Sequence, residues 1–79
     1  MSGDGASSGD SAPLEITLNG ERRTLPPGAT LLDLLADLGL DPRAVAVERN
    51  EEVLPRGRIP EVVLAAGDRL EVVRFVQGG

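Results

Sequence analysis

One segment of the chain has the spacing of an amphipathic helix, and short β-prone segments surround it. Within residues 30–39, leucines recur at helical intervals on one face: Leu31, Leu34, Leu35 and Leu38. Thr30 and Asp33 have the spacing of a capping box, and Gly39 stands where a left-handed C-terminal cap belongs. The sequence therefore predicts one helix of two to three turns that begins at Thr30.

The segments on either side of this helix have the patterns of strands. Residues 14–18 alternate apolar and polar side chains, and Asn19-Gly20 directly after them is typical of a tight hairpin turn. A second strand over residues 22–25 is expected to return antiparallel and to end at Pro26, because proline cannot donate to a strand ladder. Further strands are expected over residues 45–48, 53–54 and 69–76, with a second turn at Asn50-Glu51.

This order of elements predicts an α+β fold, a mixed sheet of four to five strands with one main helix packed across one face. Pro55 and Pro60 are expected to prevent regular pairing between them. Residues 61–66 fit either an irregular segment or a short turn of helix, with Leu64 pointing inward. The expected core contains the aliphatic residues that face one another: Leu14, Ile16, Leu18, Leu31, Leu34, Leu35, Leu38, Val45, Val47, Leu70 and Val72.

The composition argues against several functions. The 79 residues contain no Cys and no His, so the chain has no thiolate nucleophile and no thiolate or imidazole metal ligand. A self-contained enzyme and a metal site are therefore not expected, and the carboxylates of Glu48, Glu51 and Glu52 are interpreted as a solvated turn. A net charge of −5 with one aromatic residue argues against nucleic-acid binding. No apolar run approaches the roughly 18 residues of a membrane span, so a cytoplasmic location is expected. The free chain is expected to be a monomer.

Residues 1–13 differ in composition from the rest of the chain. They are rich in Gly, Ser and Asp and have no large aliphatic residue after the start, so burial cannot offset the entropy lost on ordering. The sequence predicts a disordered tail over residues 1–13 and one folded domain over residues 14–79, which includes a flexible Gly-Gly tail.

The sequence closes on Val76-Gln77-Gly78-Gly79, directly after the last expected strand. Glycines lack a Cβ atom, so this backbone can pass through a narrow channel, and no side chain shields the carboxylate of Gly79. A partner enzyme can therefore thread this segment into an active site.

An ordered set of motifs resembles one family. The set comprises Asn19-Gly20, Thr30-Leu31-x-x-Leu34-Leu35, Val45-Ala46-Val47-Glu48-Arg49-Asn50, Pro55-Arg56, Gly67-Asp68 and the closing segment 72–79. Over residues 14–79 the chain resembles the ThiS family, the ubiquitin-like β-grasp sulfur carriers of thiazole and thiamine biosynthesis. It departs from the family in its N-terminal extension and between Pro55 and Pro60, where the family often carries an aromatic residue.

The resemblance implies that the chain is a co-substrate of other enzymes. In the family, an ATP-using ThiF-type enzyme adenylates the terminal carboxylate, here that of Gly79, and sulfur from a donor such as a cysteine desulfurase displaces AMP. Gly79 then carries a glycyl adenylate and afterwards a 1-thioglycine, which a ThiG-type thiazole synthase receives. Gly78 and Gln77 form the flexible tail, and the chain itself binds no cofactor because ATP binds the partner.

Val73 and Phe75 are expected to point away from the face that holds Leu70 and Val72. We infer a docking surface for the activating enzyme there, since exposed apolar patches often mark partner sites. The alternative is that the ring of Phe75 covers the edge of the domain. Arg56 is likewise interpreted either as a solvated surface arginine or as a contact for acidic residues of a partner, and the same holds for Arg58 next to Gly57.

Three other functions stay open. The small subunit of molybdopterin synthase also ends in Gly-Gly and transfers thiocarboxylate sulfur, but its tail usually contains proline, which Val76-Gln77-Gly78-Gly79 lacks. A ubiquitin-like protein modifier is the second alternative, although a chain without Lys cannot form lysine-linked chains on itself. The third is a binding module with an incidental Gly-Gly, which would keep its function when the tail is changed.

Overall fold

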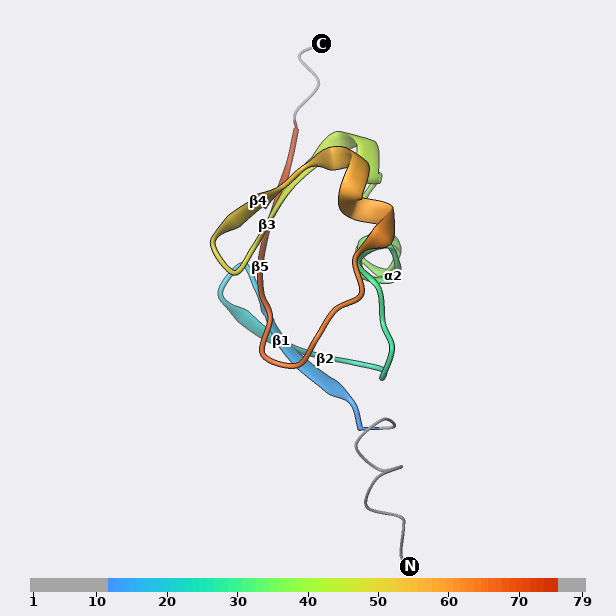
Figure 1. Cartoon of the computed structure of the whole chain (residues 1–79), viewed down its shortest axis with the longest axis vertical. Coiled ribbons are helices and arrows are strands. Elements are labelled where there is room, and N and C mark those ends of the chain that lie inside the picture. The colour runs from blue at the N-terminus through green and yellow to red at the C-terminus, as the bar shows by residue number, and fades with distance from the viewer. Residues whose placement is uncertain (1–11, 76–79) are drawn as a thin grey trace, which may run out of the picture.

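The computed structural model describes residues 12–75, in which five strands form one sheet and one α-helix lies across a face of it (Figure 1). The strands are β1 (Leu14–Leu18), β2 (Glu21–Leu25), β3 (Val45–Arg49), β4 (Glu52–Leu54) and β5 (Arg69–Arg74). The α-helix is α2 (Leu31–Asp37), and two short 3-10 helices are η1 (Pro42–Ala44) and η2 (Arg56–Glu61). The predicted α+β class, with a mixed sheet and one main helix, is confirmed.

The last strand of the chain lies at the centre of the sheet. The strand order is β2-β1-β5-β3-β4. β5 pairs in parallel with β1, where Thr17 lies opposite Arg69, and antiparallel with β3, where Val47 lies opposite Val72. β1 pairs only with the start of β5, so the end of β5, which leads to the C-terminal residues, pairs with β3 alone, as far as Arg74 opposite Val45.

The predicted start and end of the helix are confirmed. The hydroxyl oxygen of Thr30 accepts a hydrogen bond from the backbone N–H of Asp33 at 3.1 Å, and the carboxylate of Asp33 accepts one from the N–H of Thr30 at 3.0 Å. This reciprocal capping box satisfies two donors that a helix N-terminus leaves unpaired. The helix ends at Asp37, and Gly39 has the left-handed φ of +74° that was expected of it.

Both predicted turns adopt backbone conformations with positive φ. Asn19 has φ +49° and Gly20 has φ +84°, as the tight turn between β1 and β2 requires. Asn50 and Glu51, with φ +52° and +73°, turn the chain between β3 and β4. Asparagine tolerates this region because its short polar side chain can bond to nearby groups.

The expectation that no regular strand pairing runs between Pro55 and Pro60 is confirmed, because this segment lies outside the sheet. It forms η2, whereas a turn of helix was considered only for residues 61–66. Proline fits there because its φ near −65° is also the φ of a 3-10 helix. η2 buries Ile59 at 1 % exposure, and Leu64 points inward as expected, at 4 %.

The core therefore includes residues of η2 and of the segment after it, which the alternation of apolar and polar residues along the strands did not predict. Leu14 and Leu38, both expected inside, are only partly buried because they lie at the ends of their elements. The buried apolar residues are Ile16, Leu18, Leu25, Ala29, Leu31, Leu34, Leu35, Val45, Val47, Ile59, Val62, Leu64, Leu70 and Val72.

Two predictions concern residues that the structure does not describe. The disordered tail was expected over residues 1–13, of which residues 1–11 lie outside the described part, and the Gly-Gly tail lies outside it as well. Both stay predictions. Between residues 12 and 75, no helix combines the length and the apolar character that a membrane crossing requires.

Candidate functional site

The predicted sulfur-carrying residue and its tail follow directly after the described part of the chain. Gln77, Gly78 and Gly79 lie outside the described residues, so their roles stay predictions. The structure describes the residues that lead to them, from the start of β5 to Phe75. The described part of the candidate site therefore comprises β5, its neighbouring strands and the residues around Phe75.

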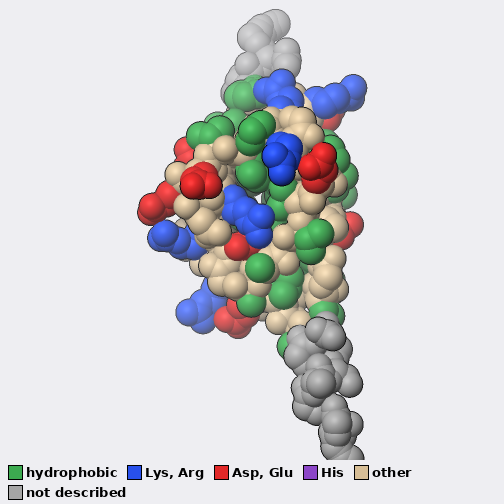
Figure 2. Space-filling view, in the orientation of Figure 1, with side chains coloured by type: hydrophobic (Ala, Val, Ile, Leu, Met, Phe, Trp, Pro, Cys, Tyr) green, Lys and Arg blue, Asp and Glu red, His purple; other side chains and the backbone are tan. Residues whose placement is uncertain are grey.

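Val73 and Phe75 lie on the outer side of the sheet, as the period of two predicted. Val73 is 60 % exposed and lies opposite Ala46 of β3, while its neighbour Val72 is buried. Phe75 is 42 % exposed. Hydrophobic side chains are visible at the upper end of the molecule, where β5 ends (Figure 2). Apolar surface is therefore exposed next to the residues that lead into the predicted tail.

Phe75 is also held in place by two contacts. Its backbone N–H donates a hydrogen bond to the carbonyl oxygen of Ala44 at 2.9 Å, which extends the pairing beyond β5. The guanidinium carbon of Arg56 lies 5.4 Å from the centroid of its ring, a cation–π distance. The ring of Phe75 therefore contacts Arg56 of η2 and stays partly exposed, and its role in docking a partner stays a prediction.

A buried carboxylate, that of Asp68, holds the start of β5. Asp68 is 6 % exposed. Its Oδ2 accepts hydrogen bonds from Arg49 Nε at 3.0 Å and from the backbone N–H of Ala65 at 2.9 Å, and its Oδ1 accepts one from Asn50 Nδ2 at 3.2 Å. The loop before β5 is therefore tied to the end of β3 by one side chain.

The charge of Asp68 is stabilised by its partners despite its burial. Burial by itself raises the pKa of this carboxyl, but the hydrogen bonds from Ala65, Asn50 and Arg49, together with the positive charge of Arg49, outweigh that effect. The pKa of Asp68 is consequently held below its ordinary value. The carboxylate stays ionised at neutral pH and keeps all of these contacts.

Two asparagines from the turns bind the backbone of β5. Asn50 Oδ1 accepts a hydrogen bond from the N–H of Arg69 at 2.9 Å. Asn19 Oδ1 accepts one from the N–H of Val72 at 2.9 Å, and Asn19 Nδ2 donates to the carbonyl oxygen of Val72 at 3.2 Å. β1 ends at Leu18, so no further backbone of β1 pairs with Val72. The side-chain amide of Asn19 makes these two hydrogen bonds to the backbone of Val72 instead. The sequence showed both asparagines only as turn residues.

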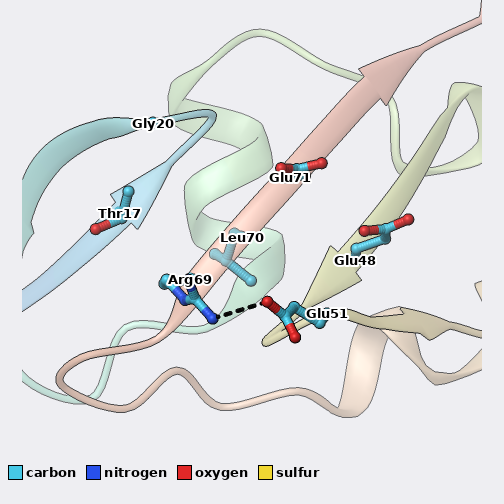
Figure 3. A pocket seen from close by; sticks show the side chains of 7 residues that line it. All are labelled: Thr17, Gly20, Glu48, Glu51, Arg69, Leu70 and Glu71. Carbon is cyan, nitrogen blue, oxygen red and sulfur yellow. Dashed lines mark hydrogen bonds and ion pairs between the residues drawn. The ribbon is translucent and has the colours of Figure 1, made fainter.

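The outer face of the sheet has an acidic part next to the apolar one. A hollow of about 220 Å³ is lined by Thr17, Gly20, Glu48, Glu51, Arg69, Leu70 and Glu71 (Figure 3). Arg69 Nη2 lies 3.2 Å from Glu51 Oε2, and Glu48 lies directly opposite Glu71 across the two strands. Within residues 12–75 no group of acidic side chains is placed to hold a metal ion.

Relatives by sequence include both carriers and enzymes. The model of the ThiS family matches residues 16–79. The sulfur carrier protein ThiS of Thermus thermophilus is 42 % identical over 64 residues, which cover 81 % of this chain and 98 % of that protein. A thiazole synthase of Paramagnetospirillum magneticum is 42 % identical over 66 residues, which are 84 % of this chain. The chain spans only 20 % of the length of that enzyme.

Solved structures also match this chain, and they agree with the match to the ThiS family model. The crystal structure of the thiamine biosynthesis protein ThiS from Geobacter metallireducens superposes with a TM-score of 0.66 at 33 % identity, covering 84 % of this chain and 100 % of the other. A designed protein based on human ubiquitin, at 23 % identity and a TM-score of 0.52, shares the fold over 85 % of this chain and 95 % of its own. The fold is thus the predicted ubiquitin-like β-grasp, and the chain belongs to the ThiS family of sulfur carrier proteins.

Proposed function

We propose that this chain carries sulfur for thiazole formation in thiamine biosynthesis, bound as a thiocarboxylate at Gly79. The observation that carries the proposal is the family match, which covers the β-grasp domain and continues through Gly79. The names of the relatives support the thiamine pathway over the molybdopterin pathway, since they are a sulfur carrier ThiS, a thiamine biosynthesis protein and a thiazole synthase.

The proposed chemistry uses the carboxylate of Gly79 as the only reacting group of the chain. A free carboxylate is a poor electrophile, so a ThiF-type partner first joins it to AMP from ATP and releases pyrophosphate. The persulfide of a donor such as a cysteine desulfurase then displaces AMP and forms an acyl disulfide with Gly79. A thiol of a partner protein breaks the S–S bond, which leaves the thiocarboxylate on Gly79 and a disulfide on the partner. The chain has no Cys or His to take over these steps, so it acts as a co-substrate and the partners supply positioning and charge stabilisation.

The final acceptor in this proposal is a ThiG-type thiazole synthase. The similarity between this chain and a fifth of a thiazole synthase supports that partner, because it places a carrier-like segment within such an enzyme. The activation step consumes ATP, which agrees with the predicted cytoplasmic location.

The short tail limits where the activating enzyme can bind. Gly79 lies four residues beyond Phe75, and a fully extended chain spans at most about 3.5 Å per residue, or about 14 Å in total. The partner must therefore contact the carrier close to Phe75 if its active site is to reach the carboxylate. This reach supports the docking surface proposed at Val73 and Phe75.

Carrier-dependent exchange of pyrophosphate into ATP tests the activation step. A ThiF-type enzyme mixed with ATP and labelled pyrophosphate is expected to catalyse exchange only when the chain is present, because the acyl adenylate forms reversibly. Absence of exchange with this chain, under conditions in which an established ThiS protein supports it, would contradict the proposal.

Val73→Asp is expected to raise the KM of the activating enzyme for the carrier by about tenfold, with little change in kcat, because a charge is placed in an apolar contact. Val63→Asp is the matched control, since Val63 is 59 % exposed and pairs with Thr30 at the helix side of the molecule. Thermal unfolding followed by circular dichroism should show that both variants are folded. Equal KM values for the two variants would refute docking at Val73.

A further inference from the structure

The arginines of this chain differ in whether they have an acidic partner. All eight basic residues are arginines, and all of them lie within the described residues. Six form ion pairs with Asp or Glu: Arg22, Arg23, Arg43, Arg49, Arg58 and Arg69. Arg56 and Arg74 form none with any residue between 12 and 75.

These two arginines lie at the same end of the molecule. Arg74 is the last residue of β5 and lies opposite Val45. Arg56 begins η2 and stacks on the ring of Phe75, the residue after Arg74. Basic side chains are visible at the upper end of the molecule, where β5 ends (Figure 2). Both guanidinium groups, which have no acidic partner among residues 12–75, therefore flank the backbone that leads to the predicted carrier tail.

The other arginines near this end are already neutralised. Arg43, in η1, lies 3.2 Å from Asp41, and the side-chain hydrogen bond from Arg43 lowers the pKa of that carboxyl. Arg58 lies 3.1 Å from Glu61. Thus, although the net charge of the chain is −5, two positive charges beside its tail have no acidic partner within the part of the chain that the structure describes. That placement provides charge complementarity to an acidic surface.

The geometry of Arg56 suits recognition of a carboxylate. A guanidinium that stacks on an aromatic ring keeps the N–H donors at its edge available, and those donors match a carboxylate in a two-point arrangement. The contact with Phe75 also restricts the side chain before any partner arrives, which reduces the entropy lost on binding.

On the basis of the proposed carrier function, we propose that Arg56 and Arg74 bind acidic side chains at the mouth of the activating enzyme's active-site channel. The length of the tail favours a contact of the two arginines at the mouth of the channel over a contact with the nucleotide bound inside the partner. Gly79 lies four residues beyond Phe75, so an extended tail places its carboxylate up to about 14 Å away. The two arginines thus select the partner at the channel entrance, next to the apolar contact of Val73.

The test compares charge removal at the tail with the same change elsewhere. Arg56→Gln/Arg74→Gln is expected to raise the KM for the carrier in pyrophosphate exchange by about thirtyfold at about 50 mM salt and by much less at about 500 mM, with kcat unchanged. The matched control is Arg22→Gln/Arg23→Gln, which also removes two charges. Arg22 is 79 % exposed and lies 4.0 Å from Glu15, and Arg23 is 38 % exposed and lies 3.7 Å from Asp37. The KM of this control should stay within about twofold of the wild type.

Further outcomes separate recognition from a structural role. Arg56→Lys keeps the charge but loses the planar donors, so it is expected to give an intermediate KM. A loss that is equal at both salt concentrations would mean that Arg56 only holds Phe75, and would overturn the inference. A KM of Arg56→Gln/Arg74→Gln equal to that of Arg22→Gln/Arg23→Gln would overturn the inference as well, while leaving the carrier function intact. If the wild-type chain supports no exchange, the proposed function fails and this inference fails with it.

Discussion

Replacing Asp68 by alanine is expected to lower the free energy of unfolding by about 3 kcal/mol, because the change removes a buried carboxylate and leaves its donors unpaired. Asp68 is 6 % exposed and accepts hydrogen bonds from Ala65, Asn50 and Arg49. The side chain of Arg49, which is only 29 % exposed, would lose its counter-charge. Urea unfolding at pH 7, followed by far-UV circular dichroism because the chain has no Trp or Tyr, measures the difference.

The pH dependence of stability provides a second readout of Asp68. Its pKa is lowered in the folded state, so the ionised group stabilises the fold above its unfolded-state pKa of about 3.9, and this contribution is lost as the pH falls through the folded-state pKa. The wild type should therefore lose more stability than Asp68→Ala below about pH 4.

A surface carboxylate provides the control for Asp68. Glu61→Ala removes an ion pair with Arg58 in which both side chains are 67 % exposed, and it is expected to change the free energy of unfolding by less than about 0.5 kcal/mol. If Asp68→Ala were as stable as Glu61→Ala, or had the acid dependence of the wild type, the assigned role of Asp68 would be wrong.

Deleting Gly79 is expected to reduce thiocarboxylate formation by at least about a hundredfold, because the reacting carboxylate would then end about 3.5 Å short of its position in the partner's active site. Gly78→Val is expected to have a similar effect, since a branched side chain would enter a channel that glycine can pass. Neither variant should change the urea midpoint, because the core lies within the described residues. Single-turnover formation of the thiocarboxylate is the measurement.

The control for the tail variants is a change at the other end of the chain. Deletion of residues 2–12 leaves the whole family match over residues 16–79 in place, so thiocarboxylate formation is expected to stay within about twofold of the wild type. Full activity of the chain without Gly79 would show that the reacting group is elsewhere.

Local patterns predicted most of the fold because the main elements are specified locally. The alternation in residues 14–18, the turn residues Asn19-Gly20 and the capping box at Thr30 all act over a few residues, and all are confirmed. η2 was missed because Pro60 was interpreted as a break in pairing. Whether Ile59 is buried depends on α2, which lies far away in the sequence.

The residues that hold β5 were not predictable, because their contacts join parts of the chain that are far apart in the sequence. Asn19 binds the backbone of Val72 across 53 residues of sequence, and Asn50 binds Asp68 across 18. The outward orientation of Val73 followed from the period of two and is confirmed by its exposure. The contact between Arg56 and Phe75 joins η2 to the end of β5, so it required the fold to be known.

Intact-protein mass spectrometry tests the central claim most directly. The chain is incubated with ATP, a ThiF-type activating enzyme and a sulfur donor, in parallel with the chain that lacks Gly79. We expect the wild type to gain the mass that corresponds to replacement of one oxygen by one sulfur, with fragmentation placing that change on Gly79, and we expect no gain in the deleted chain. An unchanged wild-type mass, under conditions in which an established ThiS protein is converted, would contradict the carrier function.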